Sequence, residues 1–248
     1  MIFYSFNVPS NYLTEFCEYQ DFMFCYPDED LSLTFALEKN LFIMLSGNVK
    51  DGSKALPLNQ LTDLAIKFNV KEVVAPYVPY NADKTYACAY DMFKYIEKRG
   101  VQSKFDVIVV PQGRSLGELF ECAKALLKLP AVTLGVHSKL LRLDKPYLLE
   151  QIRFSLIKKL FKGKLLTNKH IHLLDLYGLQ YLRAYSKIRG KFKIRSLNTD
   201  FPVALGILGK TFKQTTKRPK VGFNDGISLS KETIERIKEN IVFFKEYK

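Results

Sequence analysis

The residues best placed to do chemistry follow a predicted strand near the C-terminal third of the chain. Residues 193–197 alternate as a strand does, and Asn198, Thr199 and Asp200 come directly after them. Pro202 suits the first turn of the helix that we expect next. The triplet supplies an amide, a hydroxyl and a carboxylate at the carboxyl end of a strand, where α/β folds keep their chemistry. Asp200 is therefore a candidate catalytic acid, and capping of the helix is its alternative role.

Stretches of strand length alternate with helical patterns along the whole chain. Strands are predicted at residues 2–8, 22–26, 41–45, 72–76, 105–110, 131–136, 170–174 and 193–197. Helices are predicted after Pro202 and at 58–68, 85–98, 115–127, 146–160, 179–188 and 231–247. Strands that are apolar on both faces indicate a parallel sheet covered by helices.

We expect an α/β fold, a (β/α)8 TIM-type barrel that forms a single domain over residues 1–248. An open, doubly wound sheet is the alternative, but no predicted strand is followed by the glycine-rich loop of dinucleotide-binding folds. In a barrel the strand ends collect on one face. The segments expected there are Ser46-Gly47-Asn48, Tyr77, Gln112-Gly113, residues 135–137, Asp175 and residues 198–200.

Three histidines are weighed as ligands or catalytic groups. His137 stands at a strand end, where it suits contact with a phosphate or a base, and a loop histidine without function is the alternative. His170 and His172 alternate on one strand without Cys or carboxylate partners at metal spacing. We expect core or hydrogen-bonding roles for these two, and no metal site.

The positive charge of the chain is concentrated in one segment. The net charge is +13, and residues 139–220 hold 20 Lys or Arg against 4 Asp or Glu, which leaves 18 basic and 21 acidic residues elsewhere. Such a field attracts a polyanion, of which nucleic acid is the common one, and a solubilising surface is the alternative. The candidate phosphate contacts are Lys158, Lys159, Lys162, Lys164, Arg189, Lys191, Lys217 and Arg218.

Cysteine usage and hydropathy point to an intracellular chain. The four cysteines show no CxxC pair, so we expect free thiols. No apolar run is long enough to span a bilayer, and the first residues lack a basic segment followed by an apolar one. The prediction is a mature cytoplasmic protein with no membrane partner.

Four strand-end motifs occur in a fixed order: Val110-Pro111-Gln112-Gly113, Thr133-Leu134-Gly135-Val136, Ile171-His172-Leu173-Leu174, and Ile194-Arg195-Ser196-Leu197-Asn198-Thr199 with Pro202. In order and spacing, from about Leu41 to the C-terminus, the chain resembles the tRNA-guanine transglycosylase superfamily. The similarity is greatest to the short branch encoded by phages, which places 7-deazaguanine bases into DNA. A phage-encoded protein of this branch would work in the host cytoplasm.

The resemblance implies an enzyme that extrudes a guanine, displaces it with an aspartate nucleophile and inserts a deazapurine at the same sugar. It also implies nucleic acid, DNA favoured over tRNA, and a free 7-deazaguanine base as partners, with no cofactor. Gln112 and Gly113 match the base-binding pair of the family, and Gly135 matches a backbone position in the same pocket. The remaining positions of that implied pocket are Ser46, Gly47, Asn48 and Tyr77.

The chain departs from the family at three carboxylates. Asn198 occupies the place of the nucleophile, Leu45 the place of the general acid/base, and Tyr77 the place of a base-reading aspartate. The zinc-binding cysteines and histidine are absent too. Asp200 is the best remaining acid, and Asp51 reads as a turn residue.

Three functions follow from these observations. The first is a DNA or tRNA guanine transglycosylase-like enzyme that uses Asp200 or a residue of a partner. The second is a catalytically inactive relative that serves as a nucleic-acid-binding or scaffold subunit. The third is an unrelated barrel enzyme for phosphorylated metabolites, for which no phosphate-binding loop is found. A homodimer and a complex with a partner subunit both remain open.

Overall fold

The computed structural model describes residues 2–50, 54–137, 146–176, 185, 194–212, 214–215 and 227–247. Eight strands form one sheet in which every pairing is parallel. They are β1 (Phe3–Phe6), β2 (Met23–Cys25), β3 (Ile43–Leu45), β4 (Glu72–Val74), β5 (Asp106–Val109), β6 (Thr133–His137), β7 (His170–Leu174) and β8 (Ile194–Thr199). Each one falls within or overlaps a strand predicted from the sequence.

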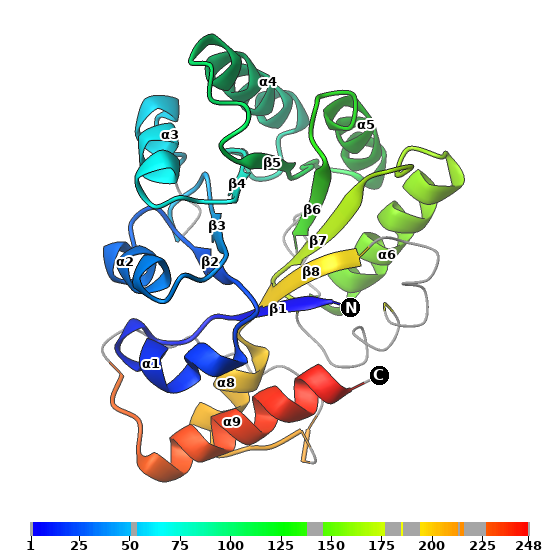
Figure 1. The fold of residues 1–248 in the computed structure, drawn as a ribbon. Coiled ribbons are helices and arrows are strands. Elements are labelled where there is room, and N and C mark those ends of the chain that lie inside the picture. The colour runs from blue at the N-terminus through cyan, green and yellow to red at the C-terminus, as the bar shows by residue number, and fades with distance from the viewer. Residues whose placement is uncertain are drawn as a thin grey trace.

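The strand order β1-β8-β7-β6-β5-β4-β3-β2 leaves β1 and β2 at the two edges. These edges meet. Asp21 N donates to Tyr4 O (2.9 Å), and Phe24 N donates to Ser5 Oγ (3.1 Å). The sheet is therefore a nearly closed (β/α)8 TIM-type barrel, as Figure 1 shows, and the predicted fold class is confirmed.

Helices surround the barrel on its outer face (Figure 1). They are α1 (Leu13–Phe16), α2 (Asp30–Glu38), α3 (Leu58–Lys67), α4 (Ala82–Lys98), α5 (Leu116–Leu126), α6 (Pro146–Lys162), α8 (Phe201–Ile207) and α9 (Lys231–Glu246), with short 3-10 turns at Ser10–Tyr12 and Cys17–Tyr19. Asn81, Ser115 and Ser230 cap α4, α5 and α9 with their side chains. The helix predicted at 179–188 lies outside the described residues except for Tyr185.

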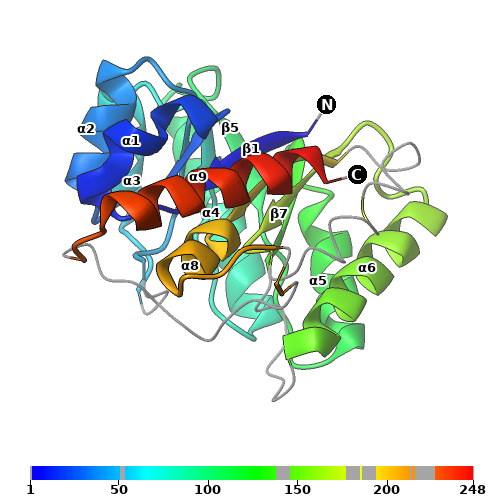
Figure 2. The same ribbon diagram turned by 90° about the horizontal axis from the view of Figure 1, so that it is seen from below.

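The C-terminal helix covers the closing edge of the barrel. Figure 2 shows α9 crossing beside α8 close to β1. The ring of Phe244 on α9 meets those of Tyr4 and Phe6 edge to face, with centroids 6.2 and 6.0 Å apart. Burial of these rings fixes the far end of the chain against its beginning.

The barrel interior is filled by its own apolar cluster, so it is not a pore. The buried members are Phe22, Phe24, Met44, Val74, Ile108, Val110 and Leu174. A larger apolar layer lies between the strands and the helices. Among the buried polar side chains of the described residues, Gln112 Nε2 and Thr133 Oγ1 have no hydrogen-bond partner.

One predicted boundary needs correction. We expected the strand to end at Leu197, but β8 continues through Asn198 and Thr199, which pair with Ser5 and Phe6 of β1. The polar residues stay in the strand because their side chains are satisfied there. Thr199 Oγ1 donates to Leu176 O at 2.7 Å.

Candidate active site at the carboxyl ends of the strands

A histidine and an aspartate from adjacent strands lie within hydrogen-bonding distance of each other at the carboxyl end of the barrel. His137 is the last residue of β6, and Asp175 follows β7. His137 Nε2 lies 3.1 Å from Asp175 Oδ2, and the two side chains are 11% and 24% exposed. Asp175 has a positive φ of 55°, a backbone conformation uncommon outside glycine and often found at functional sites.

The amide of Asn198 on β8 fixes the Asp175 carboxylate. Asn198 Nδ2 donates to Asp175 Oδ1 (3.3 Å), and Asp175 N donates to Asn198 Oδ1 (3.4 Å). His172 Nε2 lies 3.3 Å from the same Asn198 oxygen, and its Nδ1 lies 2.8 Å from Ser196 Oγ. Because the amide oxygen can only accept, Nε2 carries the ring proton and Nδ1 accepts from the serine.

The His172 ring is held neutral inside the barrel. Burial lowers its pKa to about 3. The ring lies parallel to Phe24, with centroids 6.2 Å apart, and edge to face with Phe22. This confirms the hydrogen-bonding core role expected for His172. The hydrogen bond from His172 Nε2 to the Asn198 amide oxygen also fixes the orientation of Asn198.

Arg153 of α6 fixes the backbone at the ends of both strands. It is fully buried and donates to Val136 O, Leu174 O and Asp175 O. Its charge is matched by Glu150, one turn earlier, at 2.7 Å. Arg153 therefore positions His137 and Asp175 from outside the barrel.

Two tyrosines lie near His137 and Asp175. The rings of Tyr77, after β4, and His137 have centroids 5.9 Å apart. Burial, and next the charge of Asp175, raises the pKa of both Tyr77 and Tyr26. Both phenols thus stay protonated at neutral pH and can donate hydrogen bonds. We call His137, Asp175, Asn198, Tyr77 and Tyr26 the mouth cluster.

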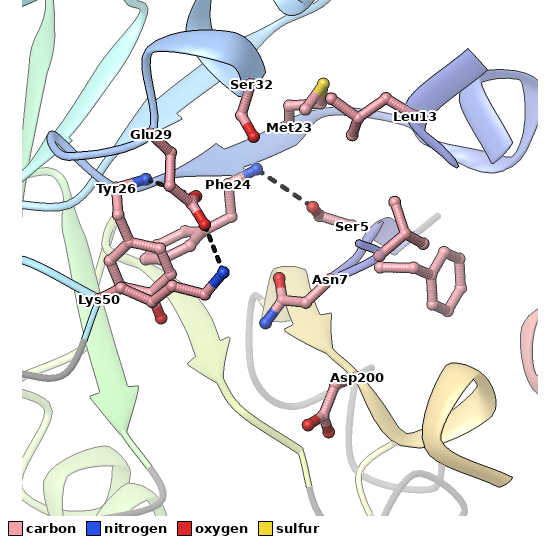
Figure 3. A pocket seen from close by; sticks show the side chains of 12 residues that line it. Ser5, Asn7, Leu13, Met23, Phe24, Tyr26, Glu29, Ser32, Lys50 and Asp200 are labelled. Carbon is pink, nitrogen blue, oxygen red and sulfur yellow. Dashed lines mark hydrogen bonds and ion pairs between the residues drawn. The ribbon is translucent and has the colours of Figure 1, made fainter. Parts of the chain in front are cut away.

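A side pocket of about 160 Å³, whose lining Figure 3 shows, shares Tyr26 with the mouth cluster. Tyr26 and Asp200 belong to its lining, and the charge of Asp200 acts on the Tyr26 hydroxyl. Lys50 brings a cation, 2.6 Å from Glu29 Oε1. Asp200 stands at the N-cap of α8, but its side chain makes no cap hydrogen bond. The pocket is slightly larger than an engineered cavity of about 150 Å³ that holds benzene, so it fits a small molecule.

The predicted pocket residues that follow β3 have structural partners. Ser46 Oγ donates to Asn48 O at 2.8 Å, and the Asn48 amide exchanges two hydrogen bonds with the backbone of Tyr77. A Cβ at Gly47 would lie 2.5 Å from Val74 O. These residues join the loops after β3 and β4.

The predicted residues after β5 and on β6 are also enclosed. Gln112 is fully buried and accepts from Tyr80 N at 3.1 Å. A Cβ at Gly113 would lie 2.6 Å from Leu119 N, and one at Gly135 would lie 2.8 Å from Val110 Cγ2. Close packing therefore accounts for both glycines.

The predicted phosphate contacts divide between described and undescribed segments. Lys158, Lys159, Lys162 and Lys164 are exposed on α6 and the turn after it. Within the described part of the chain no carboxylate is paired with them, and Lys159 Nζ lies 3.9 Å from the centre of the Phe120 ring. Arg189, Lys191, Lys217 and Arg218, as well as Asp51, lie outside the described residues. Nucleic-acid binding thus stays a prediction.

Neither a metal cluster nor a membrane helix is found in the described segments. No group of three His, Cys, Asp or Glu side chains there is placed to hold a metal ion. No described helix combines the length and apolarity needed to cross a bilayer. All four cysteines are free thiols, and burial raises the pKa of Cys122 to about 11.

The sequence did not single out Tyr26 or Arg153. Tyr26 ends an apolar strand and reads there as another core residue. The sequence did carry a signal for an ion pair of Arg153. Glu150 is one of only four acids in the basic segment, and it stands one helical turn away.

The fold and the mouth cluster define a (β/α)8 barrel with polar groups gathered at its carboxyl end. Neither a family model nor a curated protein matches the sequence. The fold is similar to 2,3-dimethylmalate lyase, a PEP mutase/isocitrate lyase superfamily member, with a TM-score of 0.52 and 9% identity over 95% of this chain and 87% of that chain. It is similar to a putative phosphonomutase from Burkholderia cenocepacia J2315, with a TM-score of 0.52 and 12% identity over 86% of this chain and 94% of that chain. An HpcH/HpaI aldolase from Desulfitobacterium hafniense DCB-2 aligns with a TM-score of 0.48, 7% identity and coverage of 89% and 94%.

These similarities correct the sequence-based identification. The similar structures are lyase and mutase barrels, so the expected resemblance to tRNA-guanine transglycosylases is wrong. Guanine exchange by Asp200 and Asn198 is wrong with it, as is the inactive relative of such an enzyme. The glycine motifs were misleading, because close packing explains why Gly113 and Gly135 are glycines.

Proposed function

We propose that this chain is an enzyme of the lyase type that cleaves a carbon–carbon bond in a small hydroxy acid at the mouth cluster. The observation that carries the proposal is the contact between His137 and Asp175, 3.1 Å apart at the ends of two adjacent strands. The similarity to a barrel named as 2,3-dimethylmalate lyase supports the choice of reaction.

The pair supplies acid–base chemistry. His137 accepts the proton from the substrate hydroxyl, and that carbon becomes a carbonyl as its bond to the neighbouring carbon breaks. The electron pair of the broken bond passes to the carbon next to the carboxylate and forms an enolate. His137 then returns the proton to this carbon, which gives a carbonyl compound and a carboxylic acid. Asp175 orients the imidazole and stabilises its charged form.

The surrounding groups suit the charge that develops. The protonated hydroxyls of Tyr26 and Tyr77 can donate to the enolate oxygens, which is the kind of preorganised stabilisation that lowers such barriers. Lys50 also lines the side pocket, where it is already paired with Glu29. Arg153 keeps the two strand ends in register, so the pair is rigidly placed.

The test follows products directly. The purified chain is incubated with 2,3-dimethylmalate, and separately with malate, and proton NMR monitors formation of a 2-oxo acid and a carboxylic acid. In D₂O the carboxylic acid product should carry one deuterium, on the carbon next to its carboxylate where the bond was broken. The His137→Gln and Asp175→Asn variants should lose about 10²-fold or more in kcat.

His170→Gln is the matched control, because His170 lies at the opposite end of β7 and should leave turnover unchanged. Cleavage that survives His137→Gln would overturn the assigned base. Failure of the wild-type chain to cleave either acid would reject the hydroxy-acid lyase.

A further inference from the structure

A second cavity lies at the opposite end of the barrel, where the strands begin. Its volume is about 260 Å³. The lining residues are Phe3, Asp21, Phe22, Phe42, Met44, Glu72, Arg195 and Ser196. A cavity of about 150 Å³ holds benzene, so this one has room for a molecule with two fused rings. We call it the amino-end pocket.

The walls of the amino-end pocket are aromatic. Phe3 and Phe42 remain 45% and 42% exposed, although large apolar side chains usually lose their contact with water on folding. Phe22 and Met44 are buried and belong to the apolar cluster of the barrel interior. Aromatic faces and a thioether favour a flat, apolar ring system.

One polar group in this pocket retains hydrogen-bonding capacity. Arg195 Nη2 pairs with Glu72 Oε1, and this is the one contact of the guanidinium within the described residues. A guanidinium has five N–H donors, so several remain for a ligand. The Arg195 side chain is only 25% exposed, which limits how well water can satisfy them. Ser196 Oγ is engaged by His172 and offers less.

The charges around the pocket are already balanced. Glu72 is matched by Arg195, and Asp21 lies 3.1 Å from Lys245 Nζ. An anionic ligand would meet the carboxylates of Glu72 and Asp21, while a cation would compete with Arg195. A neutral ligand with a hydrogen-bond acceptor avoids both costs and uses the donors that are left.

We propose that the amino-end pocket binds a small, neutral, planar molecule that packs its ring against Phe3 and Phe42 and accepts a hydrogen bond from Arg195. The site is separate from the mouth cluster, so its existence does not depend on the proposed lyase activity.

The test uses methyl NMR and three matched probes. The chain has four methionines, and Met44 lines the pocket whereas Met92 lies on α4. Coumarin, a neutral bicycle with a carbonyl acceptor, should shift the Met44 methyl resonance saturably and leave that of Met92 in place. Naphthalene, which has no acceptor, should bind about tenfold more weakly. Coumarin-3-carboxylate should bind more weakly than coumarin, because its charge meets the two carboxylates.

Exposed phenylalanines provide variants that should fold. Phe3→Ser and Phe42→Ser should each weaken coumarin binding about tenfold, because each removes an aromatic wall. Phe161→Ser is the control, since Phe161 is equally exposed (42%) but lies on α6. Arg195→Lys keeps the charge beside Glu72 but offers three N–H donors in place of five, so it should reduce the preference for coumarin over naphthalene.

The proposal fails if coumarin leaves the Met44 resonance unmoved up to its solubility limit. It fails as well if naphthalene or the carboxylate binds as tightly as coumarin, or if Phe161→Ser weakens binding as much as the two wall variants do.

Discussion

Asn198 and Asp175 hold each other across the boundary between β8 and β7. The amide of Asn198 donates to the carboxylate (3.3 Å), and the backbone N–H of Asp175 donates back to the amide oxygen (3.4 Å). Because each group satisfies the other, the carboxylate that faces His137 has one orientation. Asn198, on a third strand, thus positions the catalytic pair of the proposed lyase.

Asn198→Asp should destabilise the chain and abolish turnover. The new carboxylate would be fully buried beside Asp175, where burial and like charge raise its pKa above the unfolded value. The loss of unfolding free energy, roughly 1–3 kcal/mol, should be present at high pH and diminish as the pH falls and the group becomes protonated. Urea unfolding at pH 5 and pH 8 measures this, with exposed Asn59→Asp as the control. Equal loss at both pH values would contradict the buried charge.

His172 should make the folded state sensitive to acid. Its pKa is about 3 in the folded chain and near 6.5 when unfolded, so unfolding takes up a proton between these values. Stability is complete above pH 6.5 and should fall as the pH drops, by up to about 1.4 kcal/mol per unit. His172→Gln should flatten this dependence, and His170→Gln should not. In NMR titration, a His172 ring signal that moves near pH 6 would refute the prediction.

Arg153 and Glu150 should behave as a unit. Arg153→Met leaves the buried carboxylate of Glu150 without its cation, which should cost roughly 3–5 kcal/mol of unfolding free energy. The double variant Arg153→Met/Glu150→Leu should recover part of that stability, since no buried charge remains. Its turnover should stay low, because nothing then clamps the ends of β6 and β7 together. Equal destabilisation of the single and double variants in urea titrations would argue against the pair.

Two glycines should respond in opposite directions to alanine. At Gly47 a Cβ would lie 2.5 Å from Val74 O, a backbone atom that cannot yield, so Gly47→Ala should destabilise by about 1–3 kcal/mol or more. At Gly117 on α5 the nearest atom would be 3.7 Å away, so Gly117→Ala should stabilise by up to about 1 kcal/mol. Thermal unfolding of both variants provides the comparison, and a neutral Gly47→Ala would show that the loop can shift.

The lysines on α6 and its following turn should bind a polyanion in a salt-dependent way. Replacing each of them by Gln should reduce affinity for a single-stranded DNA oligonucleotide. The slope of log K against log salt should fall by about 0.7 for each phosphate that the variant no longer neutralises. Lys124→Gln is the control, because Lys124 pairs with Glu121. Fluorescence anisotropy measures both, and binding that ignores salt would exclude the polyanion surface.

The sequence determined the barrel but not all of its helices. Most strand residues are buried on both faces of the sheet, so the apolar runs are visible without any neighbour. Asp30–Glu38 was not predicted as a helix, because Leu31 and Leu37 are exposed while Ser32 is buried, and no helical stripe results. Asn198 and Thr199 were also predicted to lie outside the strand. Their hydrogen-bond partners are 23 residues earlier in the chain, so local sequence does not reveal them.

Only the tertiary structure decided the candidate site. His137 and Asp175 were recognisable as strand ends, but their contact depends on the parallel register of β6 and β7, which places His137 beside Leu174. Arg153 and Tyr26 act there because α6 and β2 bring them to the same end of the barrel. Composition and periodicity indicate which residues are buried. Contacts between residues on distant strands form only when the sheet closes, so these patterns do not predict them.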